Sequence, residues 1–215
     1  MLLPAITRNA VILALFAVAT AALLALTNEN TRERINCNRI NALQSSLNEV
    51  FPMTLADNNL LADMITVEDT RLGRGQHHVY RARSGDAPAG VVIESVAPDG
   101  YSGAISLLVG IRNDGEVTGV RVVPPHNETP GLGDKVETRK SDWILSFDGR
   151  SLENTSDARW AVRKDGGDFD QFTGATITPR AVVGAVHRTL HYFQAHREQL
   201  FERPAELAAT EECDG

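Results

Sequence analysis

The sequence is poor in cysteine, and this shortage excludes several kinds of metal site. Its 215 residues include only two cysteines, Cys37 and Cys213, and neither lies in a Cys-x-x-Cys pair. A zinc site or an iron–sulfur cluster built by this chain alone is therefore not predicted. The spacing leaves open whether the two cysteines pair, and unpaired thiols are the preferred interpretation.

Positive charge is also scarce. Lysine and arginine total 21 against 28 acidic residues, which gives a net charge of −7. Nucleic-acid binding needs a basic surface that neutralises phosphates, so no nucleic-acid partner is expected. The chain lacks a Gly-x-Gly-x-x-Gly fingerprint and a Gly-x-Ser-x-Gly elbow. Neither a nicotinamide dinucleotide site nor a serine-hydrolase site is predicted.

Long apolar runs are rare as well, and the one present lies at Ala10–Leu26, with one polar residue and no charge. As a helix it spans about 26 Å, close to a hydrocarbon core of about 30 Å, so residues 10–27 are predicted to cross a membrane once. A cleaved signal peptide is the alternative, because residues 17–19 and 19–21 fit an Ala-x-Ala cleavage pattern. The apolar run continues past both sites, which favours an uncleaved anchor.

The basic residues beside this run set its orientation only weakly. Arg8 precedes the run, and Arg32 and Arg34 follow it, so the flanks are nearly balanced under the positive-inside rule. A short cytoplasmic N-terminus of residues 1–9 is the default, and it places the rest of the chain across the membrane.

The segment after the apolar run is predicted to be an amphipathic stalk helix within residues 28–60. Apolar residues recur at helical spacing, and Pro52 ends the pattern; these residues are Ile40, Leu43, Leu47 and Val50. A surface helix that packs on its own domain is an equal alternative.

Strand-like runs then follow, at 77–83, 90–97, 103–111 and 116–123. The first alternates, the second is rich in valine and isoleucine, and the third is apolar nearly throughout. Asn113-Asp114-Gly115 is a hairpin turn signal between the last two. A helix from Pro179 to about Leu200 closes the domain. The predicted fold class is α+β: a single N-terminal transmembrane helix, then one domain (residues 61–203) with a largely antiparallel sheet flanked by helices, and a tail at 204–215.

The segment before the last helix carries the most informative chemistry. Thr178 followed by Pro179 predicts a helix start, with Thr178 as N-cap. The free N–H groups at such a start bind phosphate readily, and Thr176 lies two residues earlier. From the residues alone, a capped helix after a glycine turn is the simpler interpretation, and an anion site is the alternative.

Residues 173–178, Thr-Gly-Ala-Thr-Ile-Thr, resemble the Ser/Thr-Gly-Ala-Thr-x-Thr motif of the family of covalent FMN-binding domains. Further segments resemble the G-type subunit of the Rnf electron-transport complex, a family that shares part of this pattern with the C-type subunit of the sodium-pumping NADH:quinone reductase. These segments are residues 98–110, 126–135, 141–143 and 165–168.

This resemblance implies an FMN joined through its phosphate to Thr176. A separate flavin transferase makes the ester in this family and reads the motif, with Asp170 as part of what it reads. The resemblance also implies further cofactor-binding residues, namely Thr173, Gly174, Ala175, Thr178, Glu128, Thr129, Leu132 and Lys135.

The implied function is an electron-carrier subunit of a membrane-bound, ion-translocating oxidoreductase complex, with no catalytic residue of its own. The implied partners are the other subunits, the flavin transferase and membrane lipid. The expected location is a bacterial inner membrane, with the FMN domain on the periplasmic side. The alternatives are a membrane-anchored assembly or anionic-ligand-binding module without a redox role, and a free-standing flavoenzyme reductase.

No metal site is predicted. His126 has no second histidine at ligand spacing, and the acidic residues Asp165, Asp168 and Asp170 lack the glutamate that completes a calcium-binding EF-hand loop.

Overall fold

A computed structural model describes residues 2–206, without the side chains of residues 2–5 and Glu33. The chain divides into two compact units, and the boundary between them lies between Leu43 and Gln44. Most of the tail predicted at residues 204–215 lies outside the described residues.

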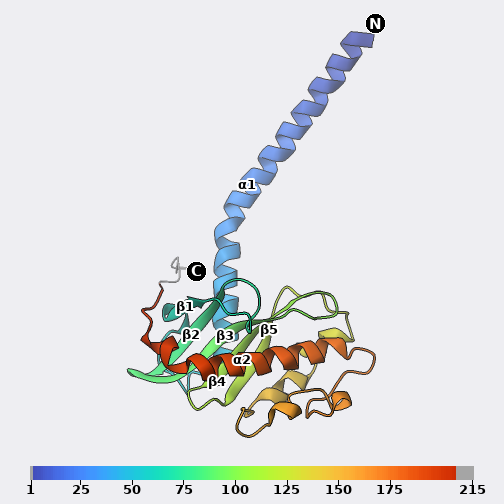
Figure 1. Ribbon diagram of the computed structural model, residues 1–215. Helices are drawn as coiled ribbons and strands as arrows, with labels where there is room; N and C mark the ends of the chain where they lie inside the picture. The colour runs from blue at the N-terminus through green and yellow to red at the C-terminus, as the bar shows by residue number, and fades with distance from the viewer. Residues whose placement is uncertain (1, 207–215) are drawn as a thin grey trace. The chain divides into compact units, whose positions relative to one another are not determined.

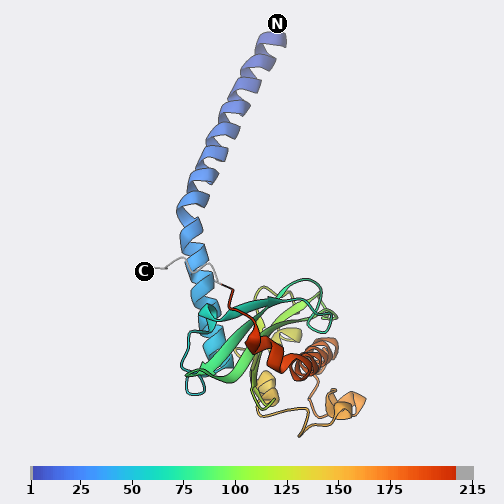
Figure 2. The ribbon, with the colours of Figure 1, turned by 60° about the vertical axis from the view of Figure 1, so that its left-hand side comes forward.

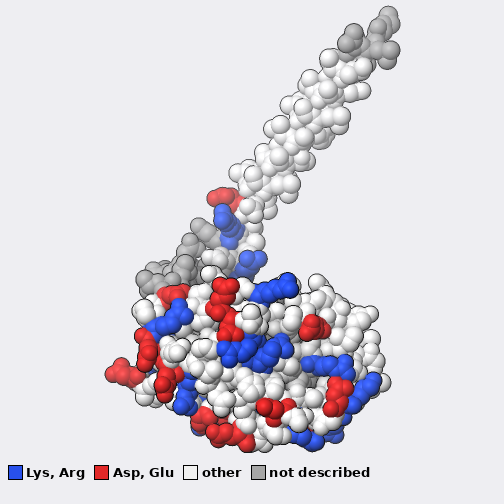
Figure 3. Space-filling view, in the orientation of Figure 1, with Lys and Arg blue, Asp and Glu red and all other residues white. Residues whose placement is uncertain are grey.

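Helix α1 spans Leu2–Val50 (Figure 1). Its apolar side chains in the first unit are exposed, as Phe16 (68%) and Leu24 (70%) illustrate. In the part of the chain that the structure describes, α1 is the one helix long and apolar enough to cross a membrane. Figure 3 shows a long stretch of it without a charged side chain. The prediction of one apolar helix near the N-terminus is confirmed.

The preference for unpaired thiols is wrong for Cys37, which takes part in a disulfide bond. Cys213, the other cysteine of the sequence, lies outside the described residues. Sequence spacing carries no information about the distance between two side chains in the fold, which decides whether a disulfide forms.

A five-stranded sheet forms the centre of the second unit, with the strand order β1-β2-β3-β4-β5 and antiparallel pairing throughout. The strands are β1 (Met64–Val67), β2 (His77–Ser84), β3 (Ala87–Ala97), β4 (Ile105–Arg112) and β5 (Val117–Val123). The predicted α+β class with a largely antiparallel sheet is confirmed. Strand β1 was not predicted, because four residues are too few for a clear alternation.

Helix α2 (Ile177–Glu202) covers one face of this sheet, as Figures 1 and 2 show from two directions. Alternate residues of each strand face the helix. Val91 and Ile93 of β3 and Val109 of β4 share one buried apolar cluster with Val182 and many further residues. This layer of helix against sheet is the main core of the domain.

The other face of the sheet packs against the last residues of α1, from Gln44 to Val50, which belong to the second unit. Leu47, Val50 and Phe51 are fully buried. Gly110 allows the close approach, since a Cβ there would lie 2.7 Å from the Val50 carbonyl oxygen. The helix ends at Val50, two residues before Pro52, which confirms the prediction that this proline stops it.

Short 3₁₀ helices fill the long connection between β5 and α2. They are η2 (Gly133–Val136), η3 (Asp142–Phe147), η4 (Asp157–Arg159) and η5 (Arg163–Asp165), and η1 (Leu60–Ala62) precedes β1. Aromatic side chains hold this connection together: Phe147 stacks on Phe169 at 4.7 Å, and Trp143 meets Phe172 edge to face at 5.2 Å. The connection therefore forms an ordered platform beside the start of α2.

Buried Arg81 on β2 anchors the other end of α2. Its Nη1 donates to the carbonyl oxygens of Leu200 (3.1 Å) and Arg203 (2.5 Å), and its Nη2 pairs with Asp63. Because a buried guanidinium needs such partners, these bonds fix where α2 ends against the sheet.

Candidate functional site

A cavity of about 210 Å³ opens at the N-terminus of α2. The loop after β5 and the turn before α2 form most of its wall, and both come from the ordered platform beside the helix. Its lining residues are Tyr101, Glu128, Thr129, Leu132, Gly133, Gly174, Ala175, Thr176, Ile177 and Thr178.

Helix α2 starts two residues earlier than the sequence predicted, so the expectation that Thr178 is the N-cap is wrong. The helix begins at Ile177, and Thr176 occupies the N-cap position without a capping bond from its side chain. The Thr176 hydroxyl, half-buried in the cavity wall, is thus not used to cap the helix. The first N–H groups of α2 have no acceptor within the helix, which makes the cavity floor suitable for an anion.

The reason for the shift is that Thr178 has another partner. Thr178 is fully buried, and its hydroxyl donates to Glu128 Oε2. The other oxygen of Glu128 accepts from the backbone N–H of Ser102 at 3.1 Å. Glu128 is itself 5% exposed, so this carboxylate joins three segments of the chain and leaves little of its acceptor capacity for a ligand.

A tight turn at Phe172–Ala175 presents Thr176 to the cavity. Ala175 N–H donates to the Phe172 carbonyl oxygen at 3.0 Å, and Gly174 has φ +82°. Such a φ is available to glycine at little cost. A Cβ on Gly174 would lie 3.6 Å from Leu132, so the turn packs directly against the opposite wall.

Ion pairs fix the acidic loop that precedes this turn. Asp165 bonds Arg180 in the first turn of α2 at 2.6 Å, and this hydrogen bond lowers the pKa of the Asp165 carboxyl. Asp168 pairs with Arg150 at 3.1 Å and with Arg159. These ion pairs tie the acidic loop to α2 and to the preceding part of the connection.

The structure brings together most of the residues that the sequence singled out. Seven of them line the cavity: Glu128, Thr129, Leu132, Gly174, Ala175, Thr176 and Thr178. Thr173 and Lys135 are not among the lining residues. Thr173 is exposed at the turn, and Lys135 is half-buried in η2, where its carbonyl oxygen accepts from Ser141 Oγ at 2.7 Å.

Three lining residues were not predicted, namely Tyr101, Gly133 and Ile177. Tyr101 and Ile177 are 66% and 46% exposed, and together with Leu132 (39%) they give the cavity an apolar rim. All three residues lie within the motifs recognised in the sequence. A motif does not show, however, which of its side chains line the cavity.

Glu128→Ala is expected to lower the free energy of unfolding by about 1–3 kcal/mol, because it leaves the buried hydroxyl of Thr178 without an acceptor. The measurement is urea unfolding of the full chain in mild detergent, followed by tryptophan fluorescence. Exposed Glu153 provides the control, and Glu153→Ala is expected to stay within about 0.5 kcal/mol of the parent. Equal stability of Glu128→Ala and the parent would contradict the assigned role.

The fold and the site define an FMN-binding domain. The family model described as the FMN-binding domain matches residues 100–191, a range that includes β4, β5, the cavity and the first half of α2. A second model, the RnfG N-terminal region, matches residues 1–50, which correspond to α1.

Relatives extend the match to nearly the whole chain, and each is named as the G-type subunit of an ion-translocating oxidoreductase complex. The Shewanella loihica protein is 50% identical over 202 residues, which cover 93% of this chain and 95% of the relative. The Vibrio vulnificus protein is 48% identical (94% and 96% covered), and the Salmonella typhimurium protein is 47% identical (93% and 96%). The chain belongs to the RnfG family, the G-type subunits of ion-translocating oxidoreductase complexes.

Proposed function

We propose that this chain is the electron-carrier subunit of a membrane-bound, ion-translocating oxidoreductase complex, with FMN joined by a phosphoester to Thr176. The observation that carries the proposal is the position of Thr176: its uncommitted hydroxyl lines a cavity at the start of a long helix. The FMN-binding family model spans this position, and the relatives are named as subunits of such complexes.

The residues present fit the phosphate end of FMN. The first turn of α2 offers backbone N–H groups, and its dipole favours a negative charge there. The lining residues include no lysine or arginine, so the helix start is the main source of positive potential at the cavity floor. In the ester, the Oγ atom of Thr176 would be the oxygen that links the threonine to the phosphorus, so the phosphate would lie beside the helix start.

The apolar rim fits the other end of the cofactor. When bound, FMN accepts and donates one or two electrons. The cavity of about 210 Å³ is smaller than pockets that enclose a ligand, about 300–1,000 Å³. Tyr101, Leu132 and Ile177 would therefore contact the flavin while leaving part of it accessible, as electron exchange with neighbouring subunits requires.

The other predicted residues, except Lys135, receive roles by the same reasoning. Glu128 and Thr178 position the helix start, while Thr129, Gly174 and Ala175 shape the wall beside Thr176. Thr173 and Lys135 lie outside the lining, and we assign Thr173 to recognition of the turn by the flavin transferase. Asp170, exposed and paired with Arg163 at 3.0 Å, would belong to the same recognition surface.

We further propose that residues 10–27 cross a bacterial inner membrane, that residues 1–9 stay in the cytoplasm, and that the FMN domain (residues 61–203) lies on the periplasmic side. The apolar, exposed part of α1 supports a membrane span. The partners would be lipid, the other subunits of the complex and the flavin transferase. Attachment by an ester would prevent loss of the cofactor in a compartment that does not make it.

The test is to produce the full chain together with a flavin transferase, denature it and separate it on a gel. Flavin fluorescence under ultraviolet light should stay with the protein band. The intact mass should exceed that of the sequence by one FMN less one water, the water lost when the ester forms. A dark band with an unchanged mass would reject covalent attachment and favour the alternative, an anionic-ligand-binding or assembly module.

A further inference from the structure

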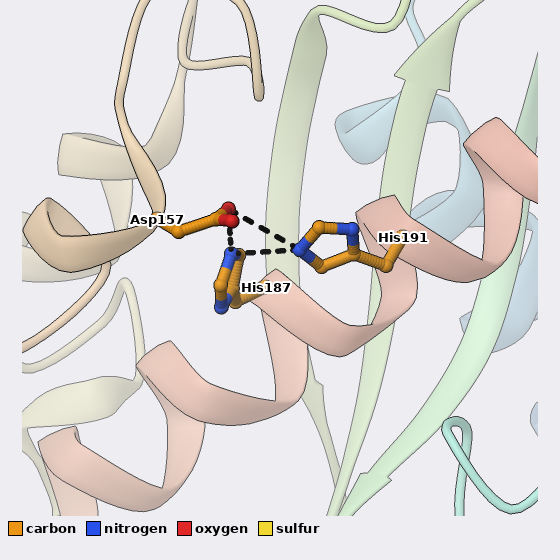
Figure 4. A group of neighbouring side chains, drawn as sticks. All are labelled: Asp157, His187 and His191. Carbon is orange, nitrogen blue, oxygen red and sulfur yellow. Dashed lines mark hydrogen bonds and ion pairs between the residues drawn. The ribbon is translucent and has the colours of Figure 1, made fainter.

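Two histidines and one aspartate converge on the surface of the second unit, outside the cavity at the start of α2 (Figure 4). Asp157 begins η4, and His187 and His191 lie on α2. Asp157 Oδ1 is 2.9 Å from His187 Nε2 and 3.3 Å from His191 Nε2. The two Nε2 atoms are 3.1 Å apart. Three atoms that can each offer a lone pair therefore face one point.

Helix geometry explains why the two histidines meet. Residues four apart lie on the same face of an α-helix, and the pattern His-x-x-x-His presents two imidazoles side by side in helical zinc sites. Here the pair lies in the middle of a 26-residue helix whose opposite side packs into the core. The backbone that carries both ligands is thus rigid.

The surroundings also fix the ring of His187. Its imidazole stacks on the indole of Trp160, with 5.5 Å between the ring centroids and an angle of 7° between the planes. Trp160 is 5% exposed, and its Nε1 donates to the Thr155 carbonyl oxygen at 3.1 Å. Trp160 lies in the same segment as Asp157. Its contact with His187 therefore holds this segment beside α2.

The three separations are equal to or slightly shorter than those between ligands of a tetrahedral metal ion. With bonds of about 2.0–2.1 Å, tetrahedral ligands lie about 3.3–3.4 Å apart, and the observed separations are 2.9, 3.1 and 3.3 Å. If both Nε2–H groups donate to Asp157, no proton is left for the 3.1 Å contact between the two ring nitrogens. A cation satisfies all three lone pairs at once.

We propose that Asp157, His187 and His191 bind one divalent transition-metal cation of the zinc class. Imidazole nitrogens suit such ions, and two histidines with one carboxylate form a known three-ligand set. The side chains of His187, His191 and Asp157 are 20%, 40% and 72% exposed, so water completes the coordination.

The site would act as a clip between two distant parts of the chain. Asp157 and His187 are 30 residues apart, and the stretch between them contains the acidic loop, the Phe172–Ala175 turn and Thr176. The three ligands come together only in the folded chain, so an ion bound to them stabilises the folded arrangement of this stretch. The cation would therefore stabilise the platform beside the cavity without touching the cavity.

The test uses the full chain in mild detergent, purified without a histidine tag and treated with a chelator that is then removed. Co²⁺ is the spectroscopic probe and Zn²⁺ the competitor. The expected result is one Co²⁺ per chain with the visible absorption of a four-coordinate ion, bleached when Zn²⁺ is added. Zn²⁺ should also raise the melting temperature, because it binds the folded chain in preference to the unfolded one.

Two variants and one control make the result specific to these residues. His191→Gln and Asp157→Asn should each weaken Co²⁺ binding at least about tenfold, the lower range for disturbing a metal site. His196→Gln is the control: His196 lies on the same helix, and its Nδ1 contacts the Tyr192 carbonyl oxygen at 2.9 Å. Circular dichroism verifies that each variant is folded.

Absence of Co²⁺ binding at sub-millimolar concentration would overturn the proposal. An equal loss of affinity in His196→Gln and His191→Gln would overturn it as well, since the ion would then bind elsewhere. The outcome is independent of the flavin, because the gel test of Thr176 needs no added metal and the Co²⁺ titration needs no FMN.

Discussion

Thr176→Ala is expected to remove all flavin fluorescence from the denatured band of this chain, and its mass should equal that of the sequence alone. The proposed ester needs the hydroxyl of Thr176, and no other threonine that lines the cavity can replace it. Thr178 is buried and donates to Glu128, while Thr129 lies on the opposite wall, in the loop after β5. The expected effect is complete loss of attachment, whereas the fold should persist, because Thr176 makes no capping bond.

Two further variants show whether a loss of flavin comes from the missing hydroxyl or from a change in the fold. Thr176→Ser keeps a hydroxyl at the same position and should retain covalent flavin. Thr138→Ala removes a half-buried threonine outside the cavity and should label like the parent. Fluorescence that remains in Thr176→Ala would show that the attachment site is another residue.

Gly167→Ala is expected to lower the free energy of unfolding by about 3 kcal/mol, at the upper end of what overpacking costs. Gly167 lies in the acidic loop before the turn and is buried. An added Cβ would lie 1.8 Å from the Ala161 carbonyl oxygen. That oxygen accepts from the Phe169 N–H at 3.2 Å, so moving it away breaks a bond that holds the loop on the aromatic platform.

Urea unfolding followed by tryptophan fluorescence measures this effect directly, because both tryptophans, Trp143 and Trp160, belong to the platform. The neighbouring glycine is the matched control. Gly166 has φ +90° but no atom within 4 Å of an added Cβ, so Gly166→Ala should cost only about 1 kcal/mol of backbone strain. A smaller effect at Gly167 than at Gly166 would contradict the packing argument.

Strand-like runs bounded by turn signals predicted most of the sheet from the sequence. The strands expected at 77–83 and 116–123 correspond to β2 and β5 within about one residue. Asn113-Asp114-Gly115 marked the hairpin correctly, with Gly115 at φ +92°. These features depend on neighbours in the sequence, which is why the sequence suffices for them.

The parts that failed depend on contacts between distant residues. The N-cap position is Thr176 rather than Thr178, because the Thr178 hydroxyl donates to Glu128, 50 residues away. The His187–His191 spacing was visible in the sequence, but the aspartate that completes the cluster lies 30 residues earlier. Tyr101 reaches the cavity from the turn before β4. A motif indicates the chemistry of a segment, whereas tertiary contacts decide which other segments join it.

The position of α2 at the end of the described chain has a consequence for the order of folding. Each strand pairs with its neighbour in sequence, so the sheet has local contacts that form early. During synthesis the N-terminal parts emerge first, and one whole apolar face of the sheet stays uncovered until the residues from Ile177 onward are made. A nascent chain that stops before Ile177 lacks both the cover of its core and the floor of its cavity. The synthesis of α2 therefore completes the cofactor site and covers the apolar face of the sheet at the same time.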